Sequence, residues 1–211
     1  MDWIVFDYAG VISHPPPDDV GARLAEAAGV EPAAFWTAYW EDRAAYDLGE
    51  VDAAAYWRGV YRRLGRPLRE EDVDRLVALD LGAWLELNEA TLEIVGALDA
   101  RGMRLALLSN APVEMARLID GQGWARLFEH RLFSADLRLA KPDAEVYRRA
   151  CRILDARPED VLFIDDRREN VDAAEAVGMT ALTFTGAARL WTDLAFALPS
   201  GMSARPSGPG R

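Results

Sequence analysis

The sequence predicts an α/β protein in which a parallel β-sheet lies between two layers of helices. Two observations lead to this fold class. Four short apolar runs are typical of strands buried on both faces of a sheet, and they cover residues 3–6, 104–108, 161–164 and 180–184. Segments with the apolar spacing of helices separate the last three runs, at residues 91–100, 144–154 and 171–177. This alternation of strand and helix favours a three-layer α/β/α arrangement.

A long segment without a strand pattern separates the first two predicted strands. It is too long for a simple crossover, so it predicts an inserted helical unit. Helices are expected there at residues 22–28, 33–46, 53–64 and 71–79. We therefore assign residues 1–14 and 86–198 to the α/β core and residues 15–85 to a small α-helical domain. Residues 199–211, rich in Gly, Pro and Ser, are expected to form a disordered tail.

Charge and composition exclude several classes of partner. The chain carries 35 acidic and 24 basic residues, a formal net charge of −11, which argues against nucleic acid or an anionic membrane surface. The single cysteine, Cys151, excludes an internal disulfide, and its helical surroundings predict a packed thiol. No run approaches the ~20 apolar residues of a membrane span, and no signal-peptide pattern opens the chain. We expect a cytoplasmic protein.

Polar side chains gather where the predicted strands end. Those that follow a strand, or lie in the connection before the third, are Asp7, Ser109, Asn110, Lys141, Asp165 and Asp166. Ligands of an open parallel sheet sit outside the carboxyl ends of its strands, so we expect these side chains at one edge. Lys141 directly precedes Pro142, a good first residue for a helix. Each polar residue alone could cap a turn or helix, but the set together indicates a functional site.

The chemistry of this set suits a metal ion and a phosphate group. Asp7, Asp165 and Asp166 offer carboxylate oxygens, which are the hard ligands that Mg²⁺ prefers. Lys141 and Ser109 are suited to phosphate oxygens. The sequence therefore indicates Mg²⁺ as cofactor and a small phosphorylated molecule as ligand.

Four short motifs in order make the chain resemble the haloacid dehalogenase-like (HAD) hydrolase superfamily. They are Phe-Asp-Tyr-Ala-Gly-Val at residues 6–11, Leu-Leu-Ser-Asn-Ala at 107–111, Ala-Lys-Pro-Asp at 140–143 and Phe-Ile-Asp-Asp at 163–166, with Asn170 four residues on. One of these motifs is weak evidence, whereas all four at this spacing are strong. The resemblance is to the branch with a helical cap after the first motif, and it implies a Rossmann-like core.

The resemblance also implies a role for each site residue. Asp7 would be the nucleophile that attacks phosphorus and forms an aspartyl-phosphate. The implied Mg²⁺ ligands are Asp7, the backbone carbonyl of Ala9 and Asp166, with Asp165 and Asn170 in supporting positions. Ser109, Asn110 and Lys141 would complete the catalytic set, Ser109 and Lys141 by binding phosphate oxygens. The cap would close over the site, exclude water and select the substrate.

Ala9 is the departure from the family pattern that matters. Phosphatases of this family usually carry a second aspartate at that position, two residues after the nucleophile, as general acid and base. A methyl group cannot transfer a proton, and such help is worth roughly 10²–10⁴ in rate. The carbonyl of Ala9 can still bind a metal ion, so metal and phosphate binding are retained while fast turnover is not assured.

Three hypotheses follow, in order of preference. The first is a Mg²⁺-dependent phosphatase, slowed or selective for its leaving group, with His14 as one group that could substitute for the acid. The second is a 2-haloacid dehalogenase, whose relatives also lack the second aspartate, although they tend to have a small polar residue where Asp166 stands. The third is a non-catalytic protein that binds a phosphate ligand or a partner in the same pocket.

Overall fold

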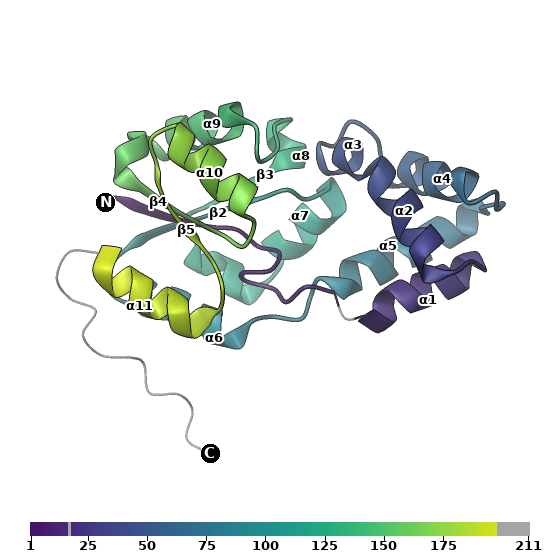
Figure 1. The fold of residues 1–211 in the computed structure, drawn as a ribbon, viewed down its shortest axis with the longest axis horizontal. Helices are drawn as coiled ribbons and strands as arrows, with labels where there is room; N and C mark the ends of the chain where they lie inside the picture. Colours follow the sequence, from purple (N-terminus) through teal and green to yellow (C-terminus); the bar gives the residue numbers. More distant parts are fainter. Residues whose placement is uncertain (17, 198–211) are drawn as a thin grey trace, which may run out of the picture.

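The computed structural model describes residues 1–16 and 18–197, and it confirms the predicted three-layer α/β architecture (Figure 1). Five strands form one parallel sheet in the order β3-β2-β1-β4-β5. Their bounds are β1 (Trp3–Phe6), β2 (Arg104–Ser109), β3 (His130–Phe133), β4 (Val161–Asp165) and β5 (Thr180–Thr183). The central strand β1 pairs with β2 on one side and with β4 on the other, so that Phe6 lies level with both Leu107 and Ile164.

Alternating strand residues supply two separate apolar cores, one on each face of the sheet. Ile4 and Phe6 point into the first core, which is covered by α6 (Glu89–Asp99), α7 (Val113–Asp120) and α11 (Ala187–Ala197). Trp3 and Val5 point into the second core, which is covered by α9 (Ala144–Leu154) and α10 (Arg168–Ala176). Figure 1 shows α9 and α10 on one side of the sheet and α6 and α11 on the other. This two-sided burial explains why the strands read as continuous apolar runs.

The four predicted strands are confirmed, with small shifts at their ends, while β3, α7 and α11 were not expected. β3 is an edge strand with the sequence His-Arg-Leu-Phe, and only its last two residues are buried. A strand with half its residues polar has no continuous apolar run by which to recognise it. Cys151 is buried, as expected of a packed thiol. The predicted tail at residues 199–211 lies outside the described residues.

The segment between β1 and α6 forms a group of five helices. These are α1 (Asp18–Ala28), α2 (Pro32–Glu41), α3 (Arg43–Asp47), α4 (Ala53–Arg63) and α5 (Glu70–Ala83). They share an apolar core of their own, built around large side chains such as Phe35, Tyr39 and Trp57. In Figure 1 this helical insert lies beyond the carboxyl ends of the strands. None of the described helices is long and apolar enough to cross a membrane.

The single helix expected over residues 33–46 is wrong, because the chain leaves helical geometry at Asp42. There φ is −110° and ψ is 10°, and the helix divides into α2 and α3. The Asp42 carboxylate accepts hydrogen bonds from Arg63 of α4, which holds the break in place. Its consequence is that the first residue of α3, Arg43, is buried against Asp80 of α5.

The core of the helical insert provides a direct test of its stability. Trp57 is fully buried there, whereas Trp40, in the same insert, is 54% exposed. Replacing a large buried aromatic residue by alanine typically costs about 3–5 kcal/mol, so Trp57→Ala should lower the midpoint of thermal unfolding by several degrees. Trp40→Ala is the matched control and should change it little. Equal shifts in the two variants would contradict the packing described here.

Candidate active site

Three acidic residues meet at the carboxyl end of the sheet because neighbouring strands end there in register. Asp7 directly follows β1, and its backbone N–H donates to the carbonyl of Ile164 at 2.9 Å. Asp165 is the last residue of β4, and Asp166 follows it. The alignment of β1 with β4 therefore places the three carboxyl groups together, and one oxygen of each lies within 4.8 Å of the others.

Lys141 links two of these carboxylates. Its Nζ lies 2.7 Å from Asp7 Oδ1 and 2.7 Å from Asp165 Oδ2, and the side chains are almost completely buried. Asn110 holds the backbone of Lys141 through two bonds: its Nδ2 donates to the Lys141 carbonyl at 2.8 Å, and its Oδ1 accepts from the Lys141 N–H at 2.9 Å. Asn110 thus positions the lysine between the two strand ends.

The expectation that Pro142 begins the helix after Lys141 is wrong. The helix begins at Ala144, and the side chain of Asp143 caps it by accepting from the N–H of Glu145 at 2.8 Å. An aspartate is a strong N-cap residue, so the helix starts after it. Pro142 remains in the preceding loop, on a cis peptide bond with Lys141.

Asp165 is the carboxylate that the site holds ionised. Burial alone would raise its pKa, but Lys141, the N–H of Arg167 at 2.9 Å and the Asn170 amide outweigh burial and lower the pKa. Asn170 Nδ2 donates to both carboxylate oxygens, at 2.9 and 3.0 Å. Asp165 is fully buried beneath Lys141, so its charge anchors the lysine.

Asp7 has the opposite electrostatic environment. Burial raises its pKa to about 8, the charge of Lys141 opposes that rise, and the neighbouring Asp165 adds to it. Its Oδ1 also accepts from the N–H of Tyr8 at 2.6 Å. One lysine charge is therefore shared by two carboxylates, and Asp165 has the larger number of donors. Without further positive charge, the ionised form of Asp7 is therefore less well stabilised than that of Asp165.

The residues around Asp7 fit a divalent cation. With all three carboxylates ionised, the cluster and its one lysine would have a net charge of −2, which a divalent ion would balance. Burial also raises the pKa of Asp166, as does the charge of Asp165. In addition, Oδ1 of Asn170 is buried and has no hydrogen-bond partner among the described residues. Carboxylate and amide oxygens are hard donors of the kind that Mg²⁺ takes.

A tight turn after Asp7 brings the backbone against Asp166. The N–H groups of Val11, Ile12 and Ser13 all point to the carbonyl of Tyr8, and Gly10 has φ of +78°. A Cβ at Gly10 would lie 2.4 Å from Asp166 Oδ2. Glycine is required here both for the left-handed backbone and for the close approach.

These groups open into a cavity of about 280 Å³ between the sheet and the helical insert. Seven predicted residues line it: Asp7, Ala9, Ser109, Asn110, Lys141, Asp166 and Asn170. Asp165 is not among the lining residues, but it contacts the cavity residue Lys141 through an ion pair. His14 is exposed and is not among the lining residues, so the cavity geometry does not support it as a substitute acid.

The helical insert also contributes to the cavity lining, and the sequence did not single out Arg43 or Asp47 for this role. The lining residues include Trp40, Arg43 and Asp47 of the insert together with Trp84, which follows α5. The available signal was a charged residue inside an aromatic stripe, since Arg43 lies four residues after Tyr39 and three before Tyr46. That spacing gives a shared helix face, but it does not reveal that the face reaches the sheet edge.

A parallel sheet with a lysine-bridged pair of aspartates, a third carboxylate and a small cavity defines a hydrolase of the α/β class. The family model of haloacid dehalogenase-like hydrolases matches residues 1–178, and the chain belongs to this family. The fold and the four motifs are thus those of one known group of enzymes.

Individual relatives include both phosphatases and dehalogenases. A probable phosphoglycolate phosphatase from Pseudomonas putida is 26% identical over 166 residues, which cover 68% of this chain and 66% of that protein. The (S)-2-haloacid dehalogenase 1 from Pseudomonas sp. (strain CBS-3) is 32% identical over 89 residues, 42% of this chain and 39% of that protein. The chain thus spans two thirds or less of the length of these relatives.

Solved structures share the fold at low sequence identity. A HAD family enzyme from Bacteroides thetaiotaomicron, solved as the wild-type protein in complex with magnesium and inorganic phosphate, superposes with a TM-score of 0.70. It is 16% identical, and the match covers 88% of this chain and 95% of that chain. At this identity, the similarity establishes a common fold.

The contrasting environments of Asp7 and Asp165 predict opposite effects of the same substitution. Because the pKa of Asp7 is raised in the folded state, its contribution to stability is present below its usual pKa and is lost as pH rises through about 8. In EDTA at pH 8–9, Asp7→Asn should therefore have a free energy of unfolding about 1–3 kcal/mol higher than that of the wild type. It should accordingly unfold at a higher temperature.

Asp165→Asn is the matched control. The lowered pKa of Asp165 means that its ionised form stabilises the fold, so this variant should unfold at a lower temperature than the wild type over the same pH range. Thermal unfolding followed by circular dichroism from pH 5 to pH 9 would measure both, and the advantage of Asp7→Asn should shrink toward pH 5. A destabilised Asp7→Asn at pH 9 would contradict the proposed charge imbalance.

Proposed function

We propose that the protein is a Mg²⁺-dependent phosphatase that acts on a small phosphorylated metabolite through an aspartyl-phosphate on Asp7. The observation that carries this proposal is the cluster of Asp7, Asp165 and Asp166 around a single lysine, open to a small cavity. Its excess negative charge suits a divalent ion, and the cavity is below the range of about 300–1,000 Å³ typical of sites for drug-sized ligands. The Mg²⁺ and phosphate bound by the Bacteroides enzyme support the same assignment.

Each residue of the site has a role in this reaction. Asp7 attacks phosphorus through a carboxylate oxygen, and water later hydrolyses the acyl phosphate. Lys141 holds Asp7 in place and contacts a phosphate oxygen, with its own position set by Asn110. Ser109, buried at the end of β2, offers its hydroxyl to another phosphate oxygen. Asp7, the carbonyl of Ala9 and Asp166 would hold a magnesium ion, which would supply positive charge to offset that of the phosphoryl group.

The helical insert serves as a cap in this proposal. It has its own apolar core, and it contributes Pro15, Trp40, Arg43, Asp47 and Trp84 to the cavity lining. With the substrate bound, these residues exclude water and contact the leaving group. The functional division is then a core of residues 1–14 and 86–198 and a cap of residues 15–85.

A haloacid dehalogenase is the second candidate. Ala9 in place of an acid and the similarity to the Pseudomonas (S)-2-haloacid dehalogenase favour it. The exposed carboxylate of Asp166 argues against it, because a third negative charge would repel a carboxylate substrate. In a Mg²⁺-dependent phosphatase the Asp166 carboxylate would bind the cation, whereas in a dehalogenase it would weaken the binding of the carboxylate substrate.

Magnesium binding can be measured without any substrate. Isothermal titration of MgCl₂ into the protein should show one site in the wild type and none in Asp166→Ala, because Asp166 offers the carboxylate of the cluster that Lys141 does not bind. Asp172→Ala, which removes an exposed carboxylate from the next turn of α10, is the control and should bind as the wild type does. Equal binding in Asp166→Ala would exclude Asp166 as a ligand.

The nucleophile can be tested by turnover. Asp7→Asn should abolish hydrolysis of p-nitrophenyl phosphate, because an amide does not form the acyl phosphate, while the fold is retained by circular dichroism. A parallel assay for halide release from 2-chloropropionate should be negative in the wild type. Halide release without phosphatase activity would support the dehalogenase, and Mg²⁺ binding without turnover of any ester would indicate a binding protein.

A further inference from the structure

Ala9 leaves the proposed phosphatase without an acid next to its nucleophile. An alkoxide leaving group needs a proton, and the water that hydrolyses the acyl phosphate must lose one. Lys141 is engaged by two carboxylates, and His14 does not line the cavity. Beyond the carboxyl groups assigned to nucleophile and metal, the acidic residue that lines the cavity is Asp47.

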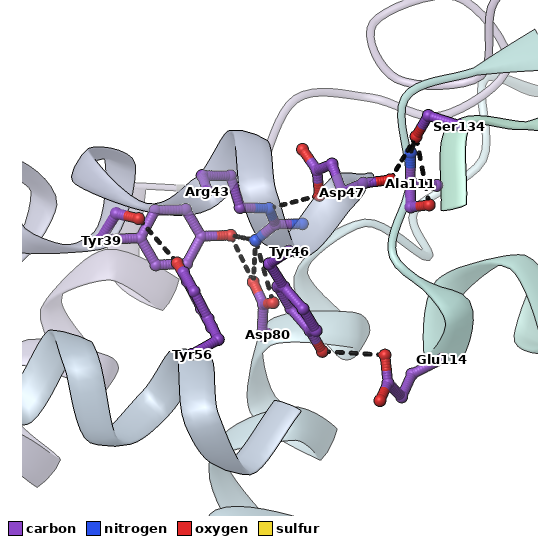
Figure 2. Close-up of polar contacts among 9 residues, drawn as sticks. All are labelled: Tyr39, Arg43, Tyr46, Asp47, Tyr56, Asp80, Ala111, Glu114 and Ser134. Carbon is purple, nitrogen blue, oxygen red and sulfur yellow. Dashed lines mark hydrogen bonds and ion pairs between the residues drawn. The ribbon is translucent and has the colours of Figure 1, made fainter. Parts of the chain in front are cut away.

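The Asp47 side chain is held at one oxygen and open at the other. Oδ1 accepts from Nε of Arg43 at 2.7 Å, while Oδ2 makes no hydrogen bond among the described residues (Figure 2). The side chain is 17% exposed, in a residue that borders the cavity. The open oxygen is therefore available to a ligand.

A chain of hydrogen bonds attaches Asp47 to the loop that follows β2. The hydroxyl of Ser134 donates to the backbone carbonyl of Asp47 and accepts from the N–H of Ala111 at 2.9 Å. Ala111 follows Ser109 and Asn110 and lines the same cavity. Figure 2 shows this link, and also the contact of Tyr46 with Glu114 of α7 at 3.0 Å. The end of α3 is thus tied to the loop after β2, whose residues line the same cavity.

The charges around Asp47 favour proton exchange near neutral pH. Burial raises its pKa to about 6, Arg43 opposes that rise, and Asp80 adds to it. Arg43 is shared between Asp47 and Asp80, with Nη1 at 3.1 Å from Asp80 Oδ2. The other titratable or charged groups that face this network or share the cavity are Tyr39, Tyr46, Tyr56, Glu114, Asp7, Tyr8, Lys141, Asp166 and Arg167.

We propose that Asp47 is the general acid and base of this enzyme, acting from the cap in place of the side chain absent at Ala9. This inference rests on the proposed phosphatase function. It goes beyond it by assigning proton transfer to a cap residue, with Arg43 as the group that orients it.

The proposed reaction has two steps. In the first, an oxygen of Asp7 forms a bond to phosphorus as the bond to the leaving oxygen breaks. The Asp47 carboxyl gives its proton to that oxygen, so the products are the alcohol, the acyl phosphate on Asp7 and an ionised Asp47. In the second, water attacks phosphorus and loses a proton to Asp47, which releases inorganic phosphate and restores both aspartates.

The test is single-turnover kinetics with Mg²⁺ and two substrates of different leaving groups. An alkyl phosphate such as glycerol 2-phosphate requires the proton, whereas p-nitrophenyl phosphate releases a stable phenolate. Asp47→Asn should slow alcohol release by ~10²-fold and p-nitrophenol release by little. Adding Ala9→Asp to Asp47→Asn should restore alkyl turnover, because it returns a carboxyl group next to Asp7.

Glu50→Gln is the control. Glu50 is an exposed acidic residue three positions after Asp47 and does not line the cavity, so its loss should affect neither substrate selectively. The wild type itself gives a second measurement that needs no variant. Its alkyl single-turnover rate should fall as pH rises above about 6, where Asp47 loses its proton, while its aryl rate should not follow that fall.

Two results would overturn the proposal while leaving the phosphatase intact. One is equal slowing of both substrates in Asp47→Asn without recovery by Ala9→Asp. The other is the same pH dependence for both substrates in the wild type. If the wild type hydrolyses no phosphate ester at all, the proposed function fails, and the role of Asp47 fails with it.

Discussion

The site depends on one buried lysine that serves two aspartates. Lys141 lies 2.7 Å from oxygens of both Asp7 and Asp165, and a single positive charge cannot compensate both in a medium of low dielectric constant. Asp165 has additional donors from Arg167 and Asn170 and remains ionised. The deficit therefore falls on Asp7. A buried carboxylate short of positive charge is unfavourable for the fold, and in a nucleophile it creates the demand for a cation beside the reacting group.

The helical insert repeats this arrangement with different residues. Arg43 is shared by Asp47 and Asp80, as Lys141 is shared by Asp7 and Asp165. In both clusters one carboxylate is nearly enclosed and the other lines the cavity. The cavity lining thus contains a carboxyl group from each cluster, Asp7 and Asp47, and burial raises the pKa of both. Because Ala9 lacks a side chain that could transfer a proton, the proposed phosphatase would take its acid–base group from the insert.

Contacts between the insert and the core give this arrangement its geometry. Ser134 joins the Asp47 carbonyl to the N–H of Ala111, and Arg138 donates to the carbonyl of Gly49. A Cβ at Gly49 would lie 3.3 Å from Ala135, and its φ is +65°, so the loop after α3 approaches the core closely. Apolar contacts add to these bonds, since Leu81 and Trp84 at the end of the insert pack against the core of the sheet.

The sequence by itself determined the sheet and the acidic edge. Strands buried on both faces must be continuously apolar, so β1, β2, β4 and β5 could be recognised, and the residues after them had to meet because parallel strands end together. It could not reveal β3, a half-polar edge strand, or the break at Asp42, which depends on Arg63 from another helix. The tertiary structure alone brought Asp47 to the same cavity as Asp7, 40 residues away in the chain. Local patterns record which face of a helix is apolar, but only packing decides which distant residues that face meets.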